Sequence, residues 1–168
     1  MRLIHTDQKG FTLIEVLIVV AIFAVVAVVT SAAIGQVVQS NRTSNHMVAL
    51  RQVQQAGYYV SKDGLQAQNI SGSLTTSSSL HLNWTDCDGG NHTVVYNLVN
   101  PSGGLYQLGR NETVNQTKTT TVVAQYICNG TTQCSWSATA KVLTFNVTAR
   151  VGLETESRTY EIKPRPSV

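Results

Sequence analysis

Few residues in this chain of 168 amino acids have the type and spacing that catalysis requires. The histidines that follow the N-terminal region are His46, His81 and His92, and none of them belongs to a pattern of histidine, carboxylate and nucleophile. The sequence also lacks a glycine-rich phosphate-binding loop and a paired metal-binding motif. We therefore expect a protein that is not an enzyme and that needs no cofactor.

Hard oxygen ligands gather in one short segment, where Asp86, Asp88 and Asn91 surround Gly89 and Gly90. Calcium prefers such ligands, so this segment is a weak candidate for a calcium site. It lacks the later ligand positions and the closing glutamate of an EF-hand loop. An Asp-Gly-Gly-Asn segment is also typical of a tight turn, which is the interpretation that we favour.

The three cysteines favour a disulfide over a metal site. Cys128 and Cys134 are separated by five residues, and a disulfide can close so short a loop in an oxidising compartment. Cys87 is then either a free buried thiol or the partner of one of the other two. Because no histidine lies at a suitable spacing, the cysteines do not predict a zinc site.

An apolar run near the N-terminus contains a single charged residue, Glu15. The run extends from Phe11 to Ile34, about 24 residues, or about 36 Å of helix, whereas the hydrocarbon core of a bilayer is about 30 Å thick. One segment in lipid can satisfy its backbone groups only as a helix. We therefore predict a transmembrane helix over residues 11–35.

Basic residues define the expected orientation of this helix. Arg2 and Lys9 precede the run, and the next basic residue is Arg42, so the positive-inside rule leaves the N-terminus in the cytoplasm. A cleaved secretory signal, with small residues for the cut at 30–33, is one simpler interpretation. The apolar run, however, exceeds the usual 7–15 residues of such a signal. A plain single-pass anchor is a second simpler interpretation. It does not explain Glu15, because a carboxylate near the bilayer centre costs about 2.5–3.5 kcal/mol.

A helical pattern continues beyond the apolar run. Apolar residues recur at steps of three and four, which predicts an amphipathic continuation of the same helix over residues 36–68. The positions that we expect to face a core are Val37, Met47, Leu50, Val53, Ala56, Gly57, Val60 and Ala67, and Tyr58 and Tyr59 are expected to pack beside them.

Residues 69–168 carry strand patterns and form the predicted β-rich globular head. A loop rich in serine and threonine is expected over residues 70–79. The expected strands lie at 80–84, 93–98, 105–108, 119–127, 141–149 and 158–162, and the first two form a hairpin. The predicted fold class is α+β, a long N-terminal α-helix packed on an antiparallel β-meander of about five or six strands.

The boundary between the polar N-terminus and the apolar run reads Lys9-Gly10-Phe11-Thr12-Leu13-Ile14-Glu15-Val16-Leu17-Ile18. This segment resembles the class III signal of type IV pilins and type II secretion pseudopilins. The resemblance implies that a prepilin peptidase cuts after Gly10, so that residues 1–10 are a cleaved leader, and that the new amino terminus on Phe11 is methylated. It also implies that the apolar helix stays on the mature protein as its assembly element.

The resemblance gives Glu15 a role as well. In the family, the free amino terminus of a neighbouring subunit pairs with a carboxylate at this position. Such a partner is needed because an unpaired charge in a water-free helix bundle is costly. The implied pair joins Glu15 of one copy to the Phe11 nitrogen of the next and penalises wrong axial placement. The alternative is an interfacial Glu15 that points to lipid headgroups.

The resemblance implies a structural subunit of a type IV pilus or a type II secretion-like pseudopilus. The layout of the head around Tyr96, Tyr106 and Tyr160 resembles minor pilins and J/W-type pseudopilins, with a major pilin as the rival. The implied partners are other pilin or pseudopilin subunits, prepilin peptidase, the inner-membrane assembly platform and cytoplasmic membrane lipid. The chain would begin in the cytoplasmic membrane and end in an extracytoplasmic fibre.

Two alternatives for the head are a tip adhesin and a module that binds DNA or a secreted cargo. Charged residues make up 12% of the chain and its net charge is only +3, without a basic stripe. Duplex DNA binding therefore has little electrostatic support, and the ligand of such a module is unknown.

Overall fold

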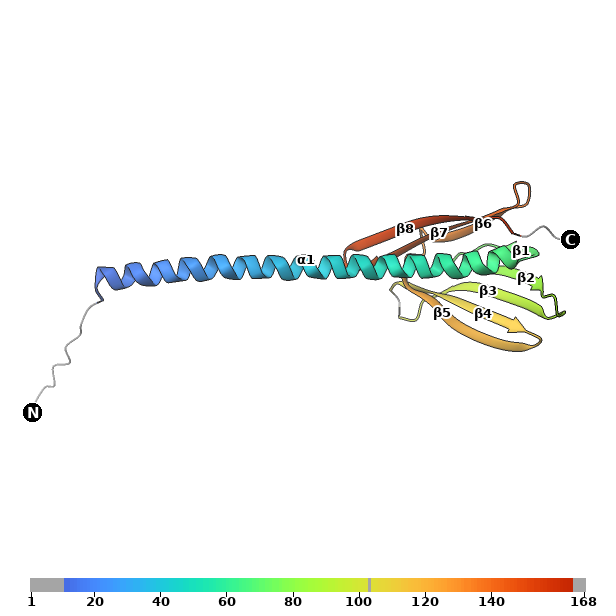
Figure 1. Cartoon of the computed structure of the whole chain (residues 1–168), viewed down its shortest axis with the longest axis horizontal. Coiled ribbons are helices and arrows are strands. Elements are labelled where there is room, and N and C mark those ends of the chain that lie inside the picture. The colour runs from blue at the N-terminus through green and yellow to red at the C-terminus, as the bar shows by residue number, and fades with distance from the viewer. Residues whose placement is uncertain (1–10, 103, 165–168) are drawn as a thin grey trace, which may run out of the picture. The chain divides into compact units, whose positions relative to one another are not determined.

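The structure is a computed structural model that describes residues 11–102 and 104–164. One long helix, α1 (Leu13–Gln66), comes first and is followed by eight strands (Figure 1). The strands are β1 (Asn69–Gly72), β2 (Leu80–Thr85), β3 (Asn91–Val99), β4 (Tyr106–Val114), β5 (Thr117–Ile127), β6 (Gln133–Ser137), β7 (Val142–Val151) and β8 (Glu154–Ile162). Every pairing among the described strands is antiparallel, so the predicted α+β fold class is confirmed.

Helix α1 belongs to two compact units. The first unit, which we call the N-terminal unit, ends at Asn41, and the second, the C-terminal unit, is Arg42–Val168. All described residues of the N-terminal unit are exposed. The C-terminal unit holds the remainder of α1 together with the whole sheet.

Polar residues of the apolar run are satisfied within the helix itself. The hydroxyl of Thr30 donates to the Val26 carbonyl at 2.8 Å, and that of Ser31 donates to the Ala27 carbonyl at 2.9 Å. Each hydroxyl thus donates a hydrogen bond to a backbone carbonyl of the preceding turn. The outer surface of this half of α1 is consequently apolar even where the sequence has a hydroxyl.

The second half of α1 buries one stripe. Its buried residues follow one another at steps of one, three and four and are Ala49, Val53, Ala56, Gly57, Val60, Asp63 and Gly64. Val53, Ala56, Gly57 and Val60 of this stripe are among the positions expected to face a core. Small side chains dominate the stripe because strands approach the helix closely on that face. At Gly57, for example, a methyl group would overlap the ring of Tyr160 on β8.

The prediction that residues at the edges of the stripe are buried is wrong at several positions. Val37 and Met47 are exposed, and Leu50 is only partly buried. Ala49 is buried beside Val53 instead. The buried stripe lies where the sheet comes closest to the helix, and it does not coincide with the largest apolar side chains. Tyr58 is also exposed, whereas Tyr59 packs against the core as expected.

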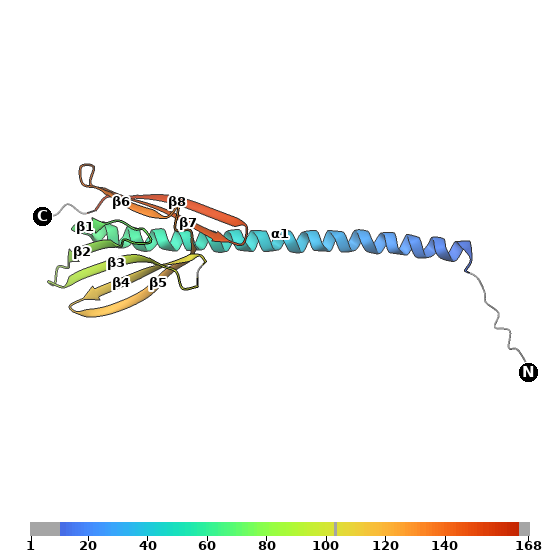
Figure 2. The ribbon, with the colours of Figure 1, turned by 180° about the vertical axis from the view of Figure 1, so that it is seen from behind.

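The sheet consists of two groups of strands on different sides of α1. Strands β1 to β5 pair in sequence order, and β7 pairs with both β6 and β8. A single pair, Ile127 with Ala149, joins β5 to β7. Figures 1 and 2 show α1 between the group β2–β5 and the group β6–β8. The helix therefore supplies the surface on which both groups pack.

The structure has more strands than the five or six that the sequence predicts. The hairpin of β2 and β3 is confirmed, with Leu80, Leu82 and Trp84 buried in alternation. The additional strands are β6 and β1, and β1 begins one residue before the predicted serine-rich loop and continues into it. Both are short and have little β-branched character, so their pairing with β2 and β7 depends on tertiary contacts and not on local preference.

Candidate functional site

The start of α1 is held by a capping box. Of the predicted processing residues, Gly10 lies outside the described part of the chain, and the Phe11 side chain is 85% exposed. Glu15 Oε2 accepts hydrogen bonds from the Thr12 backbone nitrogen at 3.3 Å and from its hydroxyl at 3.2 Å. The Glu15 nitrogen donates to Thr12 Oγ1 at 3.4 Å in return. The capping role of Thr12 was not predicted from the sequence, although Thr-x-x-Glu before an apolar run is the usual pattern of this cap.

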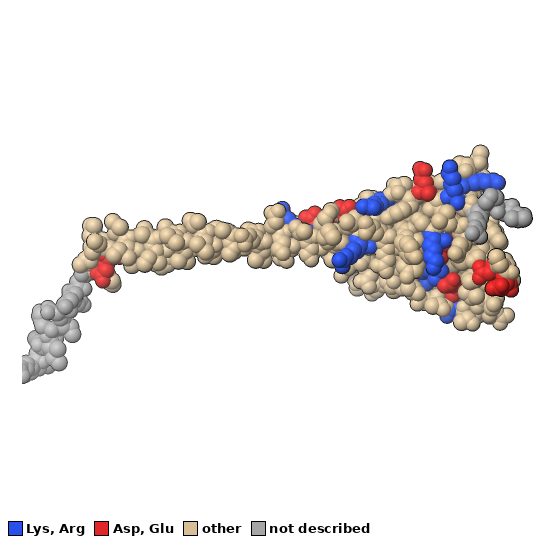
Figure 3. All heavy atoms as spheres, in the orientation of Figure 1, with Lys and Arg blue, Asp and Glu red and all other residues tan. Residues whose placement is uncertain are grey.

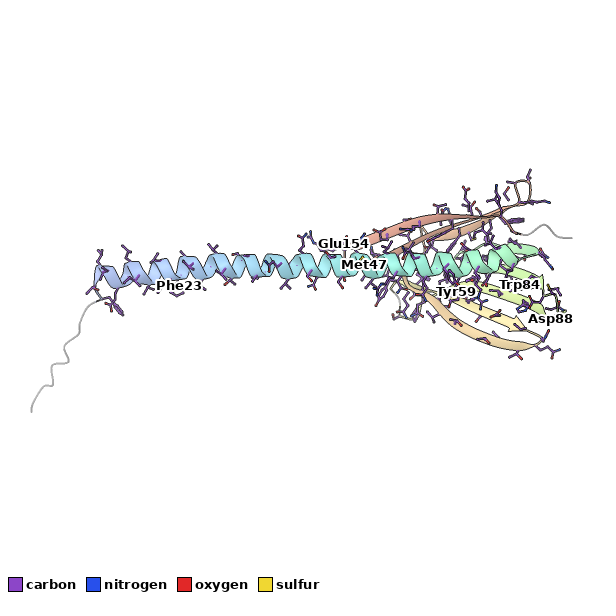
Figure 4. The ribbon with its side chains drawn as sticks, in the orientation of Figure 1. Phe23, Met47, Tyr59, Trp84, Asp88 and Glu154 are labelled. Atoms are coloured by element: carbon purple, nitrogen blue, oxygen red, sulfur yellow. The ribbon has the colours of Figure 1, made fainter. Side chains whose placement is uncertain are left out.

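Beyond the cap, the N-terminal unit presents apolar side chains on all sides. Phe23, labelled in Figure 4, is 69% exposed, and the other large apolar residues from Leu13 to Val38 are exposed to about half or more. Within the described residues, α1 is the one helix long and apolar enough to cross a membrane. Its surface fits either lipid or other apolar helices.

The C-terminal unit contains a buried polar cluster that joins α1 to the sheet. Asp63 of α1 is 1% exposed. Its Oδ2 accepts hydrogen bonds from the Tyr96 hydroxyl of β3 at 2.5 Å and from Arg110 Nε of β4 at 2.6 Å. Arg110 Nη2 also donates to Asp63 Oδ1 at 3.1 Å, so the guanidinium holds both carboxylate oxygens. The charge of Asp63 is thus fully compensated at the helix–sheet contact.

The cluster continues toward the turn between β2 and β3. Arg110 Nη1 donates to Glu112 Oε2 at 2.7 Å, and the other oxygen of Glu112 lies 3.5 Å from His92 Nδ1. His92 Nε2 lies 2.6 Å from Asp86 Oδ2. The imidazole of His92 stacks on Trp84 with ring centroids 5.0 Å apart. A continuous series of polar contacts therefore extends from the core to the turn.

Electrostatic interactions within this cluster change several pKa values. Burial, together with the charge of Asp63, raises the pKa of the Tyr96 phenol. Burial alone would lower the pKa of Arg110, but its hydrogen bonds to Asp63 and Glu112 raise it overall. The hydrogen bond from Arg110 lowers the pKa of Glu112. All three shifts favour the protonation states that keep the helix and the sheet connected at neutral pH.

This cluster was not predicted from the sequence. A signal was present in part, because Asp63 lies three residues after Val60 and seven after Ala56 and so shares their helix face. A carboxylate on an apolar stripe predicts a buried cationic partner. The identity of the partner could not be predicted, because Arg110 is 47 residues away along the chain.

The candidate calcium segment forms a turn in which Asp86 and Asn91 make protein contacts. The carboxylate of Asp86 faces His92, and Asn91 Oδ1 accepts a hydrogen bond from the Thr85 hydroxyl at 2.9 Å. Asp88 lies at the same end of the C-terminal unit as Trp84 (Figure 4). No group of three His, Cys, Asp or Glu side chains in the described residues is arranged to hold a metal. These contacts support the turn interpretation.

The three cysteines are free thiols in the structure. Cys87 is exposed, Cys128 is half-buried after the end of β5, and Cys134 is buried in β6. The expected buried state of an unpaired Cys87 is therefore wrong. Burial raises the pKa of Cys134 to about 12, so its thiolate is scarce in the folded protein. The Cys128–Cys134 disulfide stays a prediction, and it would form more readily before β6 is packed.

On the face of the C-terminal unit that Figure 3 shows, the described charged residues do not form a patch of one sign. Figure 3 shows Lys and Arg interspersed with Asp and Glu over the visible face of this unit. This face lacks the basic stripe that duplex nucleic acids require. Two features of the described residues are candidates for function, the capped apolar helix and the polar cluster. The apolar helix is exposed throughout its first half, whereas the Asp63 end of the cluster is buried.

Comparison with known proteins points to the same helix. The family model described as the prokaryotic N-terminal methylation motif matches residues 5–31, a segment that includes Phe11, Thr12 and the first part of α1. No curated protein and no solved structure matches the chain. Together with the α+β fold, the matched segment shows that the chain carries the class III prepilin signal, the N-terminal motif of type IV pilins and pseudopilins.

Proposed function

We propose that this protein is a minor structural subunit of a type IV pilus or of a type II secretion-like pseudopilus. The methylation motif carries this proposal, because it lies on a helix whose apolar side chains are exposed on every side. A surface of this kind is stable only in lipid or against other apolar helices. A fibre built around a bundle of such helices provides the second environment after the membrane has provided the first.

Processing by prepilin peptidase after Gly10 would generate a new amino terminus on Phe11, which would then be methylated. The motif match covers both residues. Phe11 and Thr12 precede α1, so a cut at this position would remove the polar leader and leave the capped helix complete.

Glu15 would pair with the Phe11 nitrogen of a neighbouring subunit during assembly. Both hydrogen bonds that Glu15 accepts in the structure use Oε2, which leaves Oε1 for a second partner. A cationic amine is a suitable partner because no basic side chain occurs between Phe11 and Asn41. Pairing between subunits would fix their axial positions, since any other position would bury an unpaired charge.

The proposed subunit spans the cytoplasmic membrane once, with its N-terminus inside, before it enters the fibre. The basic residues Arg2 and Lys9 before the apolar run support this orientation. The minor status is supported only by the strand layout of the head. Within residues 11–102 and 104–164, no specific contact favours tip adhesion or DNA binding.

The test is the intact mass and the N-terminal peptide of the protein isolated from its own cells. We expect a chain that starts at methylated Phe11. Gly10→Val should block this processing, whereas Gly35→Val, a matched change within α1, should leave it intact. A mature chain that starts near Ala33 would indicate a secretory signal, and retention of the leader in the unmodified protein would indicate a plain anchor. Either result would overturn the proposal.

Assembly requires a separate test. Glu15→Gln should be processed and inserted normally but should be lost from sheared fibres, because a neutral amide cannot neutralise the amine of the neighbour. Glu154→Gln, at the first residue of β8, is the control. Normal incorporation of the Glu15→Gln subunit would contradict the proposed pairing without affecting the processing result.

A further inference from the structure

The sheet has an open edge that the helix-based assembly proposed above does not use. Strand β5 pairs with β4 along most of its length but meets β7 only at Ile127. The side of β5 that faces away from β4 is therefore without a strand partner over residues 117–122. These residues are exposed except Thr121, which is half-buried.

Irregularities in β5 explain why its edge stays open. Val123 is an extra residue between the pairs Leu108–Ala124 and Gly109–Val122, and Gln125 and Tyr126 together oppose Gln107. Tyr126 has a left-handed φ of 60°. Bulges of this kind bend a strand. The bend directs the end of β5 toward β7 and keeps its first part away from it.

The remaining edges of the described sheet carry features that discourage strand addition. Strands β1 and β6 have only four and five residues. Strand β8 is longer but carries Glu154, Glu156, Arg158 and Glu161. Short length and charge are the usual protections of edge strands. On β5, by contrast, the run Thr117–Val122 contains a single charge, Lys118, and is rich in β-branched residues.

The hairpin geometry identifies the backbone groups at this edge. Asn115 and Gln116 both have positive φ, 47° and 75°, so they form a two-residue turn closed by the pair Val114–Thr117. Residues Val114 and Thr117 of that closing pair exchange backbone hydrogen bonds. Hydrogen-bonded and non-hydrogen-bonded pairs alternate along an antiparallel ladder, and residues of the non-bonded pairs direct their backbone groups away from the partner strand. The backbone N–H and C=O groups of Lys118, Thr120 and Val122 consequently point to the open edge.

We infer that the β5 edge pairs with the β5 edge of a second copy of this chain. Only a polypeptide strand offers matching donors and acceptors along such a row. Among the described strands of a second copy, β5 is the one edge that lacks protection. In an antiparallel pair centred on Thr120, Thr120 faces Thr120 and Lys118 faces Val122. The two lysines are therefore not opposed, and the central Thr–Thr pair is a favourable cross-strand contact.

A contact of this kind is two-fold and closes after two molecules. It cannot extend a polar fibre, in which subunits are related head to tail. In fibres of the proposed type it would link two fibres side by side. The inference is independent of the proposed processing and of the Glu15 pair, since it depends only on the C-terminal unit.

Disulfide trapping tests both the contact and its register. Full-length chains carrying Cys87→Ser, which removes the exposed thiol, are placed one per lipid nanodisc so that the apolar helices cannot associate. Facing residues of a bonded antiparallel pair have Cα atoms about 5.5 Å apart, a separation that suits a disulfide. Under mild oxidation, Thr120→Cys should give covalent dimers. A mixture of Lys118→Cys and Val122→Cys chains should give mixed dimers, whereas each alone should not.

Thr155→Cys on the charged edge of β8 is the control for random collision, and we expect no dimers from it. Thr120→Pro removes one N–H from the open edge without breaking the β4 ladder, and it should weaken the non-covalent dimer at least about tenfold. Its circular dichroism spectrum shows whether the fold is kept. Equal cross-linking of all single-cysteine chains, or no dimer from Thr120→Cys, would overturn the inference.

Discussion

Helix α1 carries two carboxylates of particular interest, and their surroundings differ in kind. Glu15 lies in the N-terminal unit and forms its hydrogen bonds with Thr12, three residues away. Asp63 lies in the C-terminal unit and is bound by Arg110 and Tyr96 from two strands. The first set of contacts is local and exposed, and the second is tertiary and buried. Removing a charge should therefore cost little stability at Glu15 and much at Asp63.

The largest expected effect is that of Asp63→Ala. The substitution leaves the Arg110 guanidinium near the core without its principal partner, and breaking a buried pair in this way costs about 3–5 kcal/mol. Glu15→Ala should leave the free energy of unfolding of the C-terminal unit unchanged. The measurement is urea unfolding of the full chain in detergent, followed by the fluorescence of Trp84 and Trp136, which both lie in the C-terminal unit.

A double variant checks the cause of this loss. Arg110→Leu added to Asp63→Ala removes the uncompensated cation and should recover part of the stability. If Asp63→Ala alone cost less than about 1 kcal/mol, the network would contribute no more than an ordinary exposed pair. The contrast with Glu15 would then disappear.

A second comparison uses one substitution in both halves of the helix. Gly57→Ala places a methyl group against the Tyr160 ring, whose hydroxyl donates to the Val53 carbonyl at 3.3 Å. Overpacking of this kind costs about 1–3 kcal/mol and exceeds the gain of up to about 1 kcal/mol that alanine brings to a helix. At Gly35 no atom lies within 4 Å of the added methyl group, so only the gain applies.

The same unfolding experiment distinguishes the effects of the two substitutions on stability. Gly57→Ala should lower the urea midpoint, and Gly35→Ala should not change it. Combining Gly57→Ala with Tyr160→Leu, which replaces the ring by a smaller side chain, should recover part of the loss. A stable Gly57→Ala single variant would mean that Tyr160 moves aside at no cost.

The parts of the molecule that the sequence predicts are those with local causes. The apolar run and the prepilin junction are contiguous, and the alternation of Leu80, Leu82 and Trp84 predicts a buried strand by itself. The capping box of Thr12 and Glu15 is equally local, and the pattern Thr-x-x-Glu was sufficient to predict it.

Features that depend on distant residues could not be predicted in the same way. Ala49 is buried in place of Met47 because of how closely the strands approach α1, and side-chain size gives no indication of that distance. Strand β1 exists because β2 offers it a partner, from Asn69–Asn83 to Gly72–Leu80. The pairing of Asp63 with Arg110 likewise needs the fold before it can be identified.

The smallest expected effect concerns acid, and it tests whether the network stabilises the C-terminal unit as a whole. The hydrogen bond from Arg110 lowers the pKa of Glu112 in the folded protein, whereas in the unfolded chain this carboxyl has an ordinary pKa of about 4.3. The contribution of Glu112 to stability is therefore complete above about pH 4.3 and is lost as the pH falls through its lower pKa in the folded protein.

Glu112→Gln tests this effect, because it keeps an acceptor for Arg110 but does not titrate. Urea midpoints measured between pH 7 and pH 3 should fall less steeply for this variant than for the unmodified chain. Glu15→Gln, in the N-terminal unit, should reproduce the unmodified profile. Identical slopes for all three chains would show that Glu112 does not couple the protonation of the network to folding.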